Sequence, residues 1–589
     1  SKLAAAVLAA VATTGVQAVN LANEETGQVL IFPYYNTNNG FVTQISLTNT
    51  TEYFKAVKVR FRESKESNDT LDFNLYMSPY DSWTGIVREN PNNGKANIIT
   101  TDETCTYPSK ALLQAGVDFI DLYTAVDAED TSEGYFEVIE MGTIADGPLP
   151  NGPADDSNLW AEIDGDGNPT GNGDTNNGDV LVVAGLEHDS DGMPADCSVV
   201  NGAWVAGDNG DAGFTRGANT PGYGIDAGGN DPYGDPLNGG LVAPTGGLTG
   251  YTIFLQASTG AAYVADATII DNYADVPQHY RSDDPDLYLL PSLASGNIFD
   301  VQIPQATGIT ATFTWPVWAA DPGLLDDISP NDPKESGRNP GPSSHLLNVQ
   351  GLSNDYFVEP GAVDGATDWV VTFPMKKHGI FNSEVISDEQ ALFCDTDGDG
   401  TGDEPAGGYF SCPYDNIVAG VVFDALNVDP PGVYVNTVDV EFSLEYWDRE
   451  EAFFVQEPDA PGFSPVIDPD QPTLTLDREV NVLTWSETQG TTNSVLGTPV
   501  DNVFSVTLQP GFEGGWAKIT FDDRYNLGNI NTPFYDISPI NATGVAGSMG
   551  VPAIGFAALR GTVGNAGASG ETIPHVRYRG TLTAPPPAP

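Results

Sequence analysis

Apolar and polar residues alternate with a period of two along most of this chain. Val57, Val59 and Phe61 alternate with Lys58, Arg60 and Arg62, and Val440, Phe442, Leu444 and Tyr446 alternate with Glu441, Ser443 and Glu445. Such alternation is typical of half-buried strands in antiparallel sheets. Similar runs recur at 28–35, 41–49, 70–77, 135–141, 251–256, 369–373, 418–423, 480–485, 503–508 and 516–521. Gly, Pro, Asn and Asp separate them, as turns between strands require.

The strand pattern predicts a mostly β protein made of several immunoglobulin-like β-sandwich domains. Only residues 109–125 and 388–393 have the pattern of short helices. With 589 residues, of which 40% are hydrophobic, the chain can bury several cores. The expected boundaries are a discontinuous sandwich at 19–142 and 248–333, an acidic Gly/Asp-rich insertion at 143–247, sandwiches at 344–458 and 462–583, and a Pro-rich tail at 584–589.

The N-terminal residues have the pattern of a secretory signal peptide. Residues 3–11 (LAAAVLAAV) form a short apolar run, and residues 16–18 (VQA) place small side chains where a signal peptidase cleaves. The alternative is a buried helix, but we favour a signal at 1–18 and a mature chain that begins near Val19. No later segment offers about twenty uninterrupted apolar residues, so no transmembrane segment is expected.

The charge is strongly one-sided. The chain has 82 Asp and Glu against 22 Lys and Arg residues, which gives a formal net charge of −60. This charge repels nucleic acid and anionic membranes, so no nucleic-acid partner is expected. Counterions or bound cations must offset the self-repulsion, which indicates a saline or calcium-rich setting. Between 111 and 333 the only basic residues are Arg216 and Arg281, so an acidic middle and more basic ends allow attraction between copies.

Residues 395–403 (DTDGDGTGD) form the strongest candidate metal site. Asp395, Asp397 and Asp399 alternate with small residues, and Asp403 follows after a further turn. Oxygen ligands at this spacing, with glycines that let the backbone turn tightly, suit a hard cation such as Ca²⁺. The segment is not an EF-hand, because position twelve of the loop is Ala406 and not a bidentate Glu.

The insertion contains further acidic turns. The candidate ligands are Asp164, Asp166, Asn168, Asp174, Asp189, Asp191 and Asp196. Their spacing predicts one or two additional calcium ions. The alternative is a solvated acidic loop without a bound ion.

Four cysteines in an exported chain predict disulfide bonds. Cys394 and Cys412 flank the acidic turn, so a bridge between them would close the candidate metal site. Cys105 and Cys197 would then pair by default. Of the three possible connectivities we favour this one. A zinc site is not expected, because there is no CxxC motif and the five histidines are scattered.

Motifs for catalysis are missing from the sequence. It contains no GxSxG, HExxH, P-loop or strand-following GxGxxG pattern, so an enzyme is not expected. The two carboxylates of a glycosidase are recognised by their separation in space, so a hydrolase stays open as an alternative. The nine tryptophans are interpreted as core residues and not as sugar-binding platforms: Trp83, Trp160, Trp204, Trp315, Trp318, Trp369, Trp447, Trp485 and Trp516.

Two segments carry a resemblance to a known class of proteins. Residues 27–35 (GQVLIFPYY) and 69–85 (DTLDFNLYMSPYDSWTG) resemble a family of exported β-rich proteins of Gram-negative bacteria. The size, acidity and signal type resemble the surface-layer (S-layer) proteins of marine Gammaproteobacteria. The resemblance implies a secreted structural protein that assembles with copies of itself on the outer cell surface and in biofilm matrix.

Attachment to the cell is expected to be non-covalent. The sequence has no LPxTG sorting signal and no lipobox cysteine at the mature start. An anionic chain needs a cation to bridge it to anionic lipopolysaccharide, and Ca²⁺ can share its six to eight oxygen ligands between partners. The alternative function is a secreted calcium-binding carbohydrate-binding protein or hydrolase of the matrix.

Overall fold

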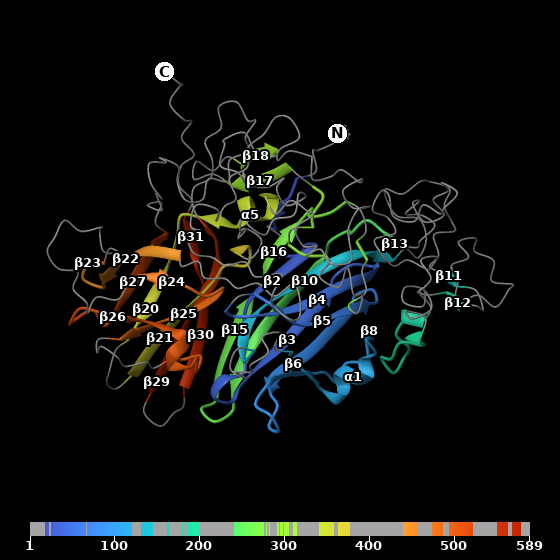
Figure 1. Cartoon of the computed structure of the whole chain (residues 1–589), viewed down its shortest axis with the longest axis horizontal. Coiled ribbons are helices and arrows are strands. Elements are labelled where there is room, and N and C mark those ends of the chain that lie inside the picture. The colour runs from blue at the N-terminus through green and yellow to red at the C-terminus, as the bar shows by residue number, and fades with distance from the viewer. Residues whose placement is uncertain are drawn as a thin grey trace, which may run out of the picture.

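Two β-sandwiches lie side by side in the computed structural model of this chain (Figure 1). The structure describes residues 18–22, 25–65, 67–120, 131–144, 162–163, 180–181, 185–198, 241–275, 278–279, 282, 291–293, 295–298, 300–304, 310–314, 341–358, 363–376, 440–456, 474–486, 494–521, 551–563 and 568–578. Strands dominate these residues and form several antiparallel sheets, so the predicted mostly β class is confirmed.

The first sandwich is built from segments 20–144 and 241–271. One sheet has the order β1 (Asn20–Leu21), β16 (Thr268–Asp271), β2 (Val29–Asn36), β10 (Glu133–Ile144), β4 (Phe54–Glu63), β5 (Asp69–Met77) and β8 (Cys105–Tyr107), and β13 (Leu241–Val242) also pairs with β10. The facing sheet has the order β15 (Ala261–Asp266), β14 (Leu248–Gln256), β3 (Phe41–Asn49), β6 (Ser82–Glu89), β7 (Ala96–Ile99) and β9 (Val117–Asp118). Phe32, Phe61 and Phe136 stack in the buried core of this sandwich.

The second sandwich is built from segments 351–372, 440–521 and 554–578. Its outer sheet has the order β23 (Phe453–Gln456), β22 (Val440–Asp448), β27 (Gly514–Phe521), β20 (Gly351–Phe357) and β31 (Val576–Tyr578), and β24 (Thr475–Leu476) also pairs with β22. Its inner sheet has the order β26 (Val503–Thr507), β25 (Val480–Ser486), β21 (Val363–Thr372), β29 (Ile554–Val563) and β30 (Ala568–Pro574). Trp369, Trp485 and Tyr356 pack against one another between the sheets.

The strand order corrects the expected domain boundaries. The predicted boundary between sandwiches at 344–458 and 462–583 is wrong, because β27 pairs with both β20 and β22 and so joins the two ranges in one sheet. β21 likewise pairs with β25 and β29. Local alternation identifies a strand but not its distant partner. In the first sandwich, β14 begins at Leu248 and pairs along its length with β3, so the chain rejoins this sandwich after the insertion.

A common core joins the two sandwiches. Tyr34, Phe254 and Phe556 form an aromatic cluster across the junction, with ring centroids 5.5, 5.8 and 6.5 Å apart. The Thr572 hydroxyl donates to the Val264 carbonyl, where β30 and β15 lie side by side (Figure 1). The aromatic cluster and the neighbouring strand edges hold the sandwiches in one fixed arrangement.

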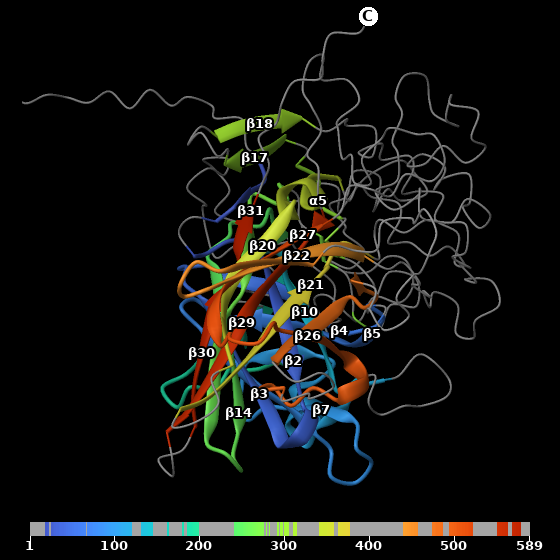
Figure 2. The same cartoon turned by 90° about the vertical axis from the view of Figure 1, so that its left-hand side faces the viewer.

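Short elements connect the sheets. They are η1 (Asn38–Gly40), α1 (Lys110–Ala115), α5 (Gly341–Leu347), η8 (Val500–Asn502), the pair β11 (Glu162–Ile163) and β12 (Val180–Leu181), the hairpin β17 (Asp300–Pro304) and β18 (Thr310–Thr314), and the pair β19 (Asn348–Val349) and β28 (Val551–Pro552). Both views place β17, β18 and α5 above the sandwiches (Figures 1 and 2).

Helix α1 is shorter than predicted. It is capped by Ser109 and stops at Gly116, whose φ of 92° ends the helix before 125. The second predicted helix, at 388–393, lies outside the described residues. Within the described part of the chain, no helix has the length and apolarity needed to cross a membrane.

Candidate functional site

Most of the predicted metal ligands lie outside the described residues. These are Asp395, Asp397, Asp399, Asp403, Asp164, Asp166, Asn168 and Asp174, together with Cys394 and Cys412, and the signal sequence up to residue 17. Asp189, Asp191 and Asp196 lie in the described segment 185–198. This segment is therefore the described part of the predicted acidic insertion that contains candidate metal ligands.

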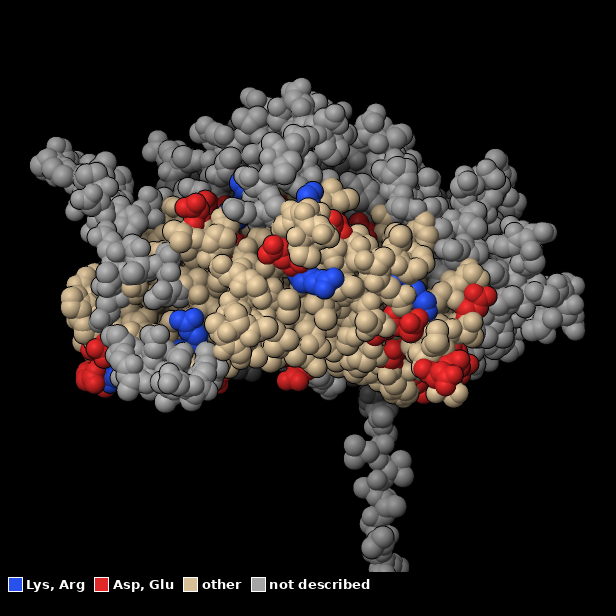
Figure 3. Space-filling model, turned by 90° about the horizontal axis from the view of Figure 1, so that it is seen from below, with Lys and Arg blue, Asp and Glu red and all other residues tan. Residues whose placement is uncertain are grey.

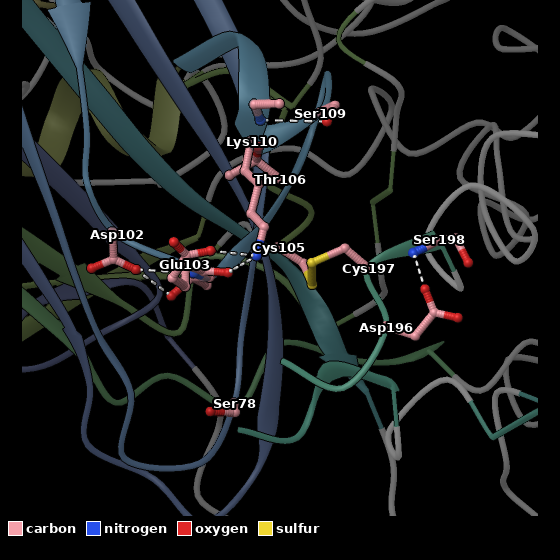
Figure 4. The surroundings of a disulfide bond; sticks show 12 residues. Ser78, Asp102, Glu103, Cys105, Thr106, Ser109, Lys110, Asp196, Cys197 and Ser198 are labelled. Atoms are coloured by element: carbon pink, nitrogen blue, oxygen red, sulfur yellow. Dashed lines mark hydrogen bonds and ion pairs between the residues drawn. A yellow bond between two sulfur atoms is a disulfide. The ribbon is translucent and has the colours of Figure 1, made fainter. Parts of the chain in front are cut away.

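A disulfide bond ties this segment to the first sandwich. The Sγ atoms of Cys105 and Cys197 are 1.99 Å apart, so the predicted pairing of these two cysteines is confirmed. Cys105 begins strand β8 at the edge of its sheet, and Cys197 lies on the adjoining segment (Figure 4). The bond holds the end of segment 185–198 against the sheet edge.

The acidic side chains of the segment cap its own turns. Asp189 Oδ1 accepts hydrogen bonds from the backbone N–H groups of Asp191 and Met193 at 2.8 and 3.1 Å. Asp196 accepts from the Ser198 N–H at 2.9 Å, and hydrogen bonds from Ser198 lower the pKa of Asp196 (Figure 4). Across the described ranges, no group of three or more His, Cys, Asp or Glu side chains is placed to hold a metal. Asp189, Asp191 and Asp196 therefore do not by themselves assemble a three-ligand site.

A second contact places segment 185–198 beside two acidic side chains of the first sandwich, Asp81 and Asp102. His188 Nδ1 lies 3.8 Å from Asp81 Oδ1, and Asp81 Oδ2 accepts from the Thr104 hydroxyl at 3.1 Å. Burial raises the pKa of Asp81, and the neighbouring Asp102 carboxylate adds to this shift, while His188 opposes it. Sequence reasoning missed this contact, because more than one hundred positions separate Asp81 from His188.

Strand β4 carries a stripe of buried ion pairs. These join Lys55 to Glu140, Lys58 to Asp72, Arg60 to Asp69 and Arg62 to Glu137, at 2.8, 2.8, 3.4 and 2.7 Å. The expectation that this strand is half-buried is wrong, because both of its faces are buried. A further layer covers the basic face: Arg60 donates to the Pro291 carbonyl at 3.1 Å, and Tyr76 forms a hydrogen bond with His279 at 3.0 Å.

Burial makes these pairs sensitive to the loss of either partner. It lowers the pKa of Lys58 and raises that of Asp72, while the charge of each partner opposes these shifts. Removing one member of such a pair leaves an uncompensated charge in the interior. Each pair of one basic and one acidic residue is electrically neutral. Burying the pairs therefore removes basic side chains from the surface and leaves the net negative charge of the remaining residues unchanged.

Two buried carboxyl groups lie at the junction of the sandwiches. Glu133 accepts from the Tyr34 hydroxyl at 2.9 Å, and burial raises the pKa of Glu133. Asp368 Oδ2 accepts from the Ser494 hydroxyl at 2.7 Å and from the Leu496 N–H at 2.9 Å. Burial raises the pKa of Asp368 to about 7 despite these hydrogen bonds. Asp368 therefore changes its charge near neutral pH, inside the common core.

The outer sheet of the second sandwich exposes aromatic rings. Phe453, Trp447 and Trp516 stack across three adjacent strands, with centroid distances of 4.7 and 3.9 Å. Trp516 is 43% and Phe453 50% exposed, and Trp447 is half-buried. The interpretation of the tryptophans as core residues is confirmed for three of them, Trp83, Trp369 and Trp485, and is wrong for Trp516. Trp160, Trp204, Trp315 and Trp318 lie outside the described residues.

Charged side chains are sparse on another face of the molecule. Seen from below, the described surface is mostly uncharged, with acidic and basic side chains in small separate groups (Figure 3).

Comparison of the chain with protein-family models, curated proteins and solved structures finds no match. The function of this chain is therefore inferred from its residues and their geometry.

Proposed function

We propose that this chain is a structural surface-layer protein, which assembles with Ca²⁺ into a two-dimensional lattice on the outer surface of a Gram-negative cell and in biofilm matrix. The observation that carries the proposal is the common core of the two sandwiches. A lattice repeats accurately only if its building block does not bend. Two sandwiches that share a core form such a block, whereas sandwiches joined by a flexible linker do not.

Hydrogen bonds across the junction support a rigid block. The Thr372 hydroxyl donates to the Pro33 carbonyl at 2.6 Å, and the Ser64 carbonyl accepts from the N–H groups of Glu479 and Val480, both at 2.9 Å. These contacts connect segments more than three hundred positions apart in the sequence. Bending at the junction would break these hydrogen bonds together with the contacts of the aromatic cluster.

Charge is the reason for a cation in this proposal. The chain has a net charge of −60, and the buried ion pairs of β4 remove basic side chains that could otherwise meet acidic groups on a neighbouring copy. Copies of such a chain, and lipopolysaccharide, repel one another wherever their acidic surfaces meet without divalent cations between them. Calcium sites of extracellular proteins have a Kd of roughly 10⁻⁴ to 10⁻³ M. One such site adds about 1.4 kcal/mol to the free energy of unfolding when the Ca²⁺ concentration is ten times the Kd.

Chelation tests the proposal. Envelopes of cells that produce this chain are imaged by negative stain in Ca²⁺, after excess EDTA, and after Ca²⁺ is returned. We expect a periodic layer that EDTA dissolves and Ca²⁺ restores. A variant with Asp395→Asn, Asp397→Asn and Asp399→Asn should need more Ca²⁺ to assemble. Its control is Asp266→Asn, Asp275→Asn and Asp501→Asn, which changes the charge equally at exposed positions. Sheets that survive EDTA, or envelopes without a periodic layer, contradict the proposal.

The second candidate is a secreted calcium-binding carbohydrate-binding protein or hydrolase of the matrix. The exposed rings of Phe453 and Trp516 favour it, because aromatic side chains are common in sugar-binding surfaces. A glycan array combined with a hydrolysis screen separates the two candidates. Binding or cleavage by a chain that forms no sheets would support this second function.

A further inference from the structure

The outer face of the sheet β23-β22-β27-β20-β31 concentrates exposed apolar side chains. We call it the aromatic face. Thirteen large apolar side chains are exposed in the described part of the chain, and five of them lie here: Phe453, Val455, Trp516, Val576 and Tyr578. Clustered exposed apolar groups indicate an interaction surface, whereas scattered ones need no explanation. This face is therefore the strongest candidate contact surface among the described residues.

Strand register arranges the face in rows. Phe453, Trp447, Trp516 and Asp355 are successive cross-strand partners in the first row. Val455, Glu445, Lys518, Ser353 and Val576 are successive partners in the second row. Because directly opposed residues of paired strands point to the same side of a sheet, both rows face outward. The opposite side of β22 and β27 carries the buried Leu444 and Ile519.

The central ring of the first row has no free face on which a sugar could stack. Sugars stack on the faces of aromatic rings. The planes of Trp447 and Trp516 are 6° apart, with centroids 3.9 Å apart, and Phe453 covers the other side of Trp447. Both faces of Trp447 are therefore occupied, and this ring presents its edge to solvent. Ring edges pack well against the side chains of another protein.

The second row has balanced and self-complementary charge. Lys518 Nζ lies 3.9 Å from Glu445 Oε2 and 4.7 Å from the centroid of the Tyr578 ring. In a contact with two-fold symmetry, the same patch meets itself, so Lys518 of each copy can approach Glu445 of the other. Within the two rows, Lys518 and Glu445 offset one another and Asp355 is the one remaining charge, so two copies meet here with much less repulsion than the net charge of −60 implies.

We propose that the aromatic face binds the same face of a second copy, which makes a two-fold dimer the unit from which the surface layer is built. This inference rests on the proposed function and names one of its contacts. The contact is apolar at its centre, so it does not require Ca²⁺. Chelation then dissolves the layer to dimers and not to monomers.

Sedimentation velocity of the purified full-length chain in EDTA, over a range of concentrations, tests the inference. We expect a wild-type dimer. Trp516→Thr combined with Phe453→Thr should raise the dimer Kd by about tenfold or more, because buried aromatic anchors dominate such contacts. Both positions are exposed, so the substitutions should leave the fold intact. The control is Tyr251→Thr on β14, a side chain that is 41% exposed in the first sandwich, and it should leave the Kd unchanged.

A charge exchange provides a second test of the two-fold contact. Lys518→Glu alone and Glu445→Lys alone each place like charges opposite one another and should weaken the dimer. The double variant restores opposite charges and should recover most of the dimer affinity. The inference is overturned if the wild type is a monomer in EDTA, or if the Trp516 and Phe453 substitutions leave the dimer Kd unchanged. Retention of a monomeric wild type on an insoluble polysaccharide, lost in the Trp516 variant, would assign the face to a saccharide instead. Sheets that resist EDTA would contradict the proposed function and leave the dimer measurement interpretable.

Discussion

Replacing Asp368 by Asn is expected to stabilise the folded protein at pH 8 and to leave its stability at pH 4 nearly unchanged. The Asp368 side chain is fully buried in β21, and its Oδ2 accepts from the Ser494 hydroxyl and the Leu496 N–H. An Asn side chain keeps an oxygen acceptor for both donors and carries no charge. The substitution therefore removes the buried negative charge at little steric cost.

The magnitude follows from the pKa of Asp368. Burial raises this pKa from 3.8 to about 7 in the folded protein. Between these two pH values the unfolded chain has lost the proton and the folded protein keeps it, so stability falls as pH rises through this window and levels off above about pH 7. A shift of about three pKa units at 1.36 kcal/mol each corresponds to roughly 4 kcal/mol. Asp368→Asn should gain up to this amount at pH 8.

Urea unfolding followed by tryptophan fluorescence from pH 4.5 to 8.5 provides the assay. The difference in unfolding free energy between wild type and variant isolates position 368, because the other acidic groups are shared. Asp266→Asn on β15 is the control, since this side chain is exposed and its difference should stay flat with pH. A difference that is constant with pH for Asp368→Asn, or a variant less stable than wild type at pH 8, would refute the reasoning.

Two further substitutions test the packing of the first sandwich. Cys105→Ser with Cys197→Ser removes a cross-link between residues 92 positions apart and should cost about 4–5 kcal/mol in the chain-entropy model. It should also expose segment 185–198 to proteases. If dithiothreitol does not lower the urea midpoint of the wild type, the predicted stability contribution of the disulfide bond is wrong. Arg62→Met leaves Glu137 buried without its basic partner and should cost about 3–5 kcal/mol, whereas the exposed control Arg88→Met should cost less than about 0.5 kcal/mol. If Arg62→Met and Arg88→Met lower the melting temperature equally, the buried pair of Arg62 and Glu137 contributes no more to stability than an exposed arginine.

Alternation identified strands well where one face of a sheet meets solvent. In β22, the predicted stripe of Val440, Phe442, Leu444 and Tyr446 is buried, and Ser443 on the other face is only half-buried. In β4 the same pattern led to a wrong expectation, because a third layer covers the basic face. Alternation reports a difference between two faces and does not report what lies beyond either of them.

The candidate site was predicted less completely. The preferred pairing of Cys394 with Cys412 left Cys105 to pair with Cys197 by default, and the bond between Cys105 and Cys197 is present. The calcium ligands at 395–403 stay a prediction. The aromatic face was missed, because Trp447 and Trp516 sit in alternating runs whose local pattern does not distinguish a covered from an uncovered sheet face.

The sequence by itself determined the β class, the positions of many strands and the large negative charge, because each depends on composition or on neighbours one or two positions apart. Only the tertiary structure decided that β20, β22 and β27 share one sheet, that the basic residues of β4 are buried and that Asp368 lies in a common core. Contacts between residues far apart in the sequence set these features. The entropy cost of closing a loop rises only slowly with loop length, so a strand can pair with another that lies hundreds of positions away. The local pattern of the strand therefore does not identify its partner.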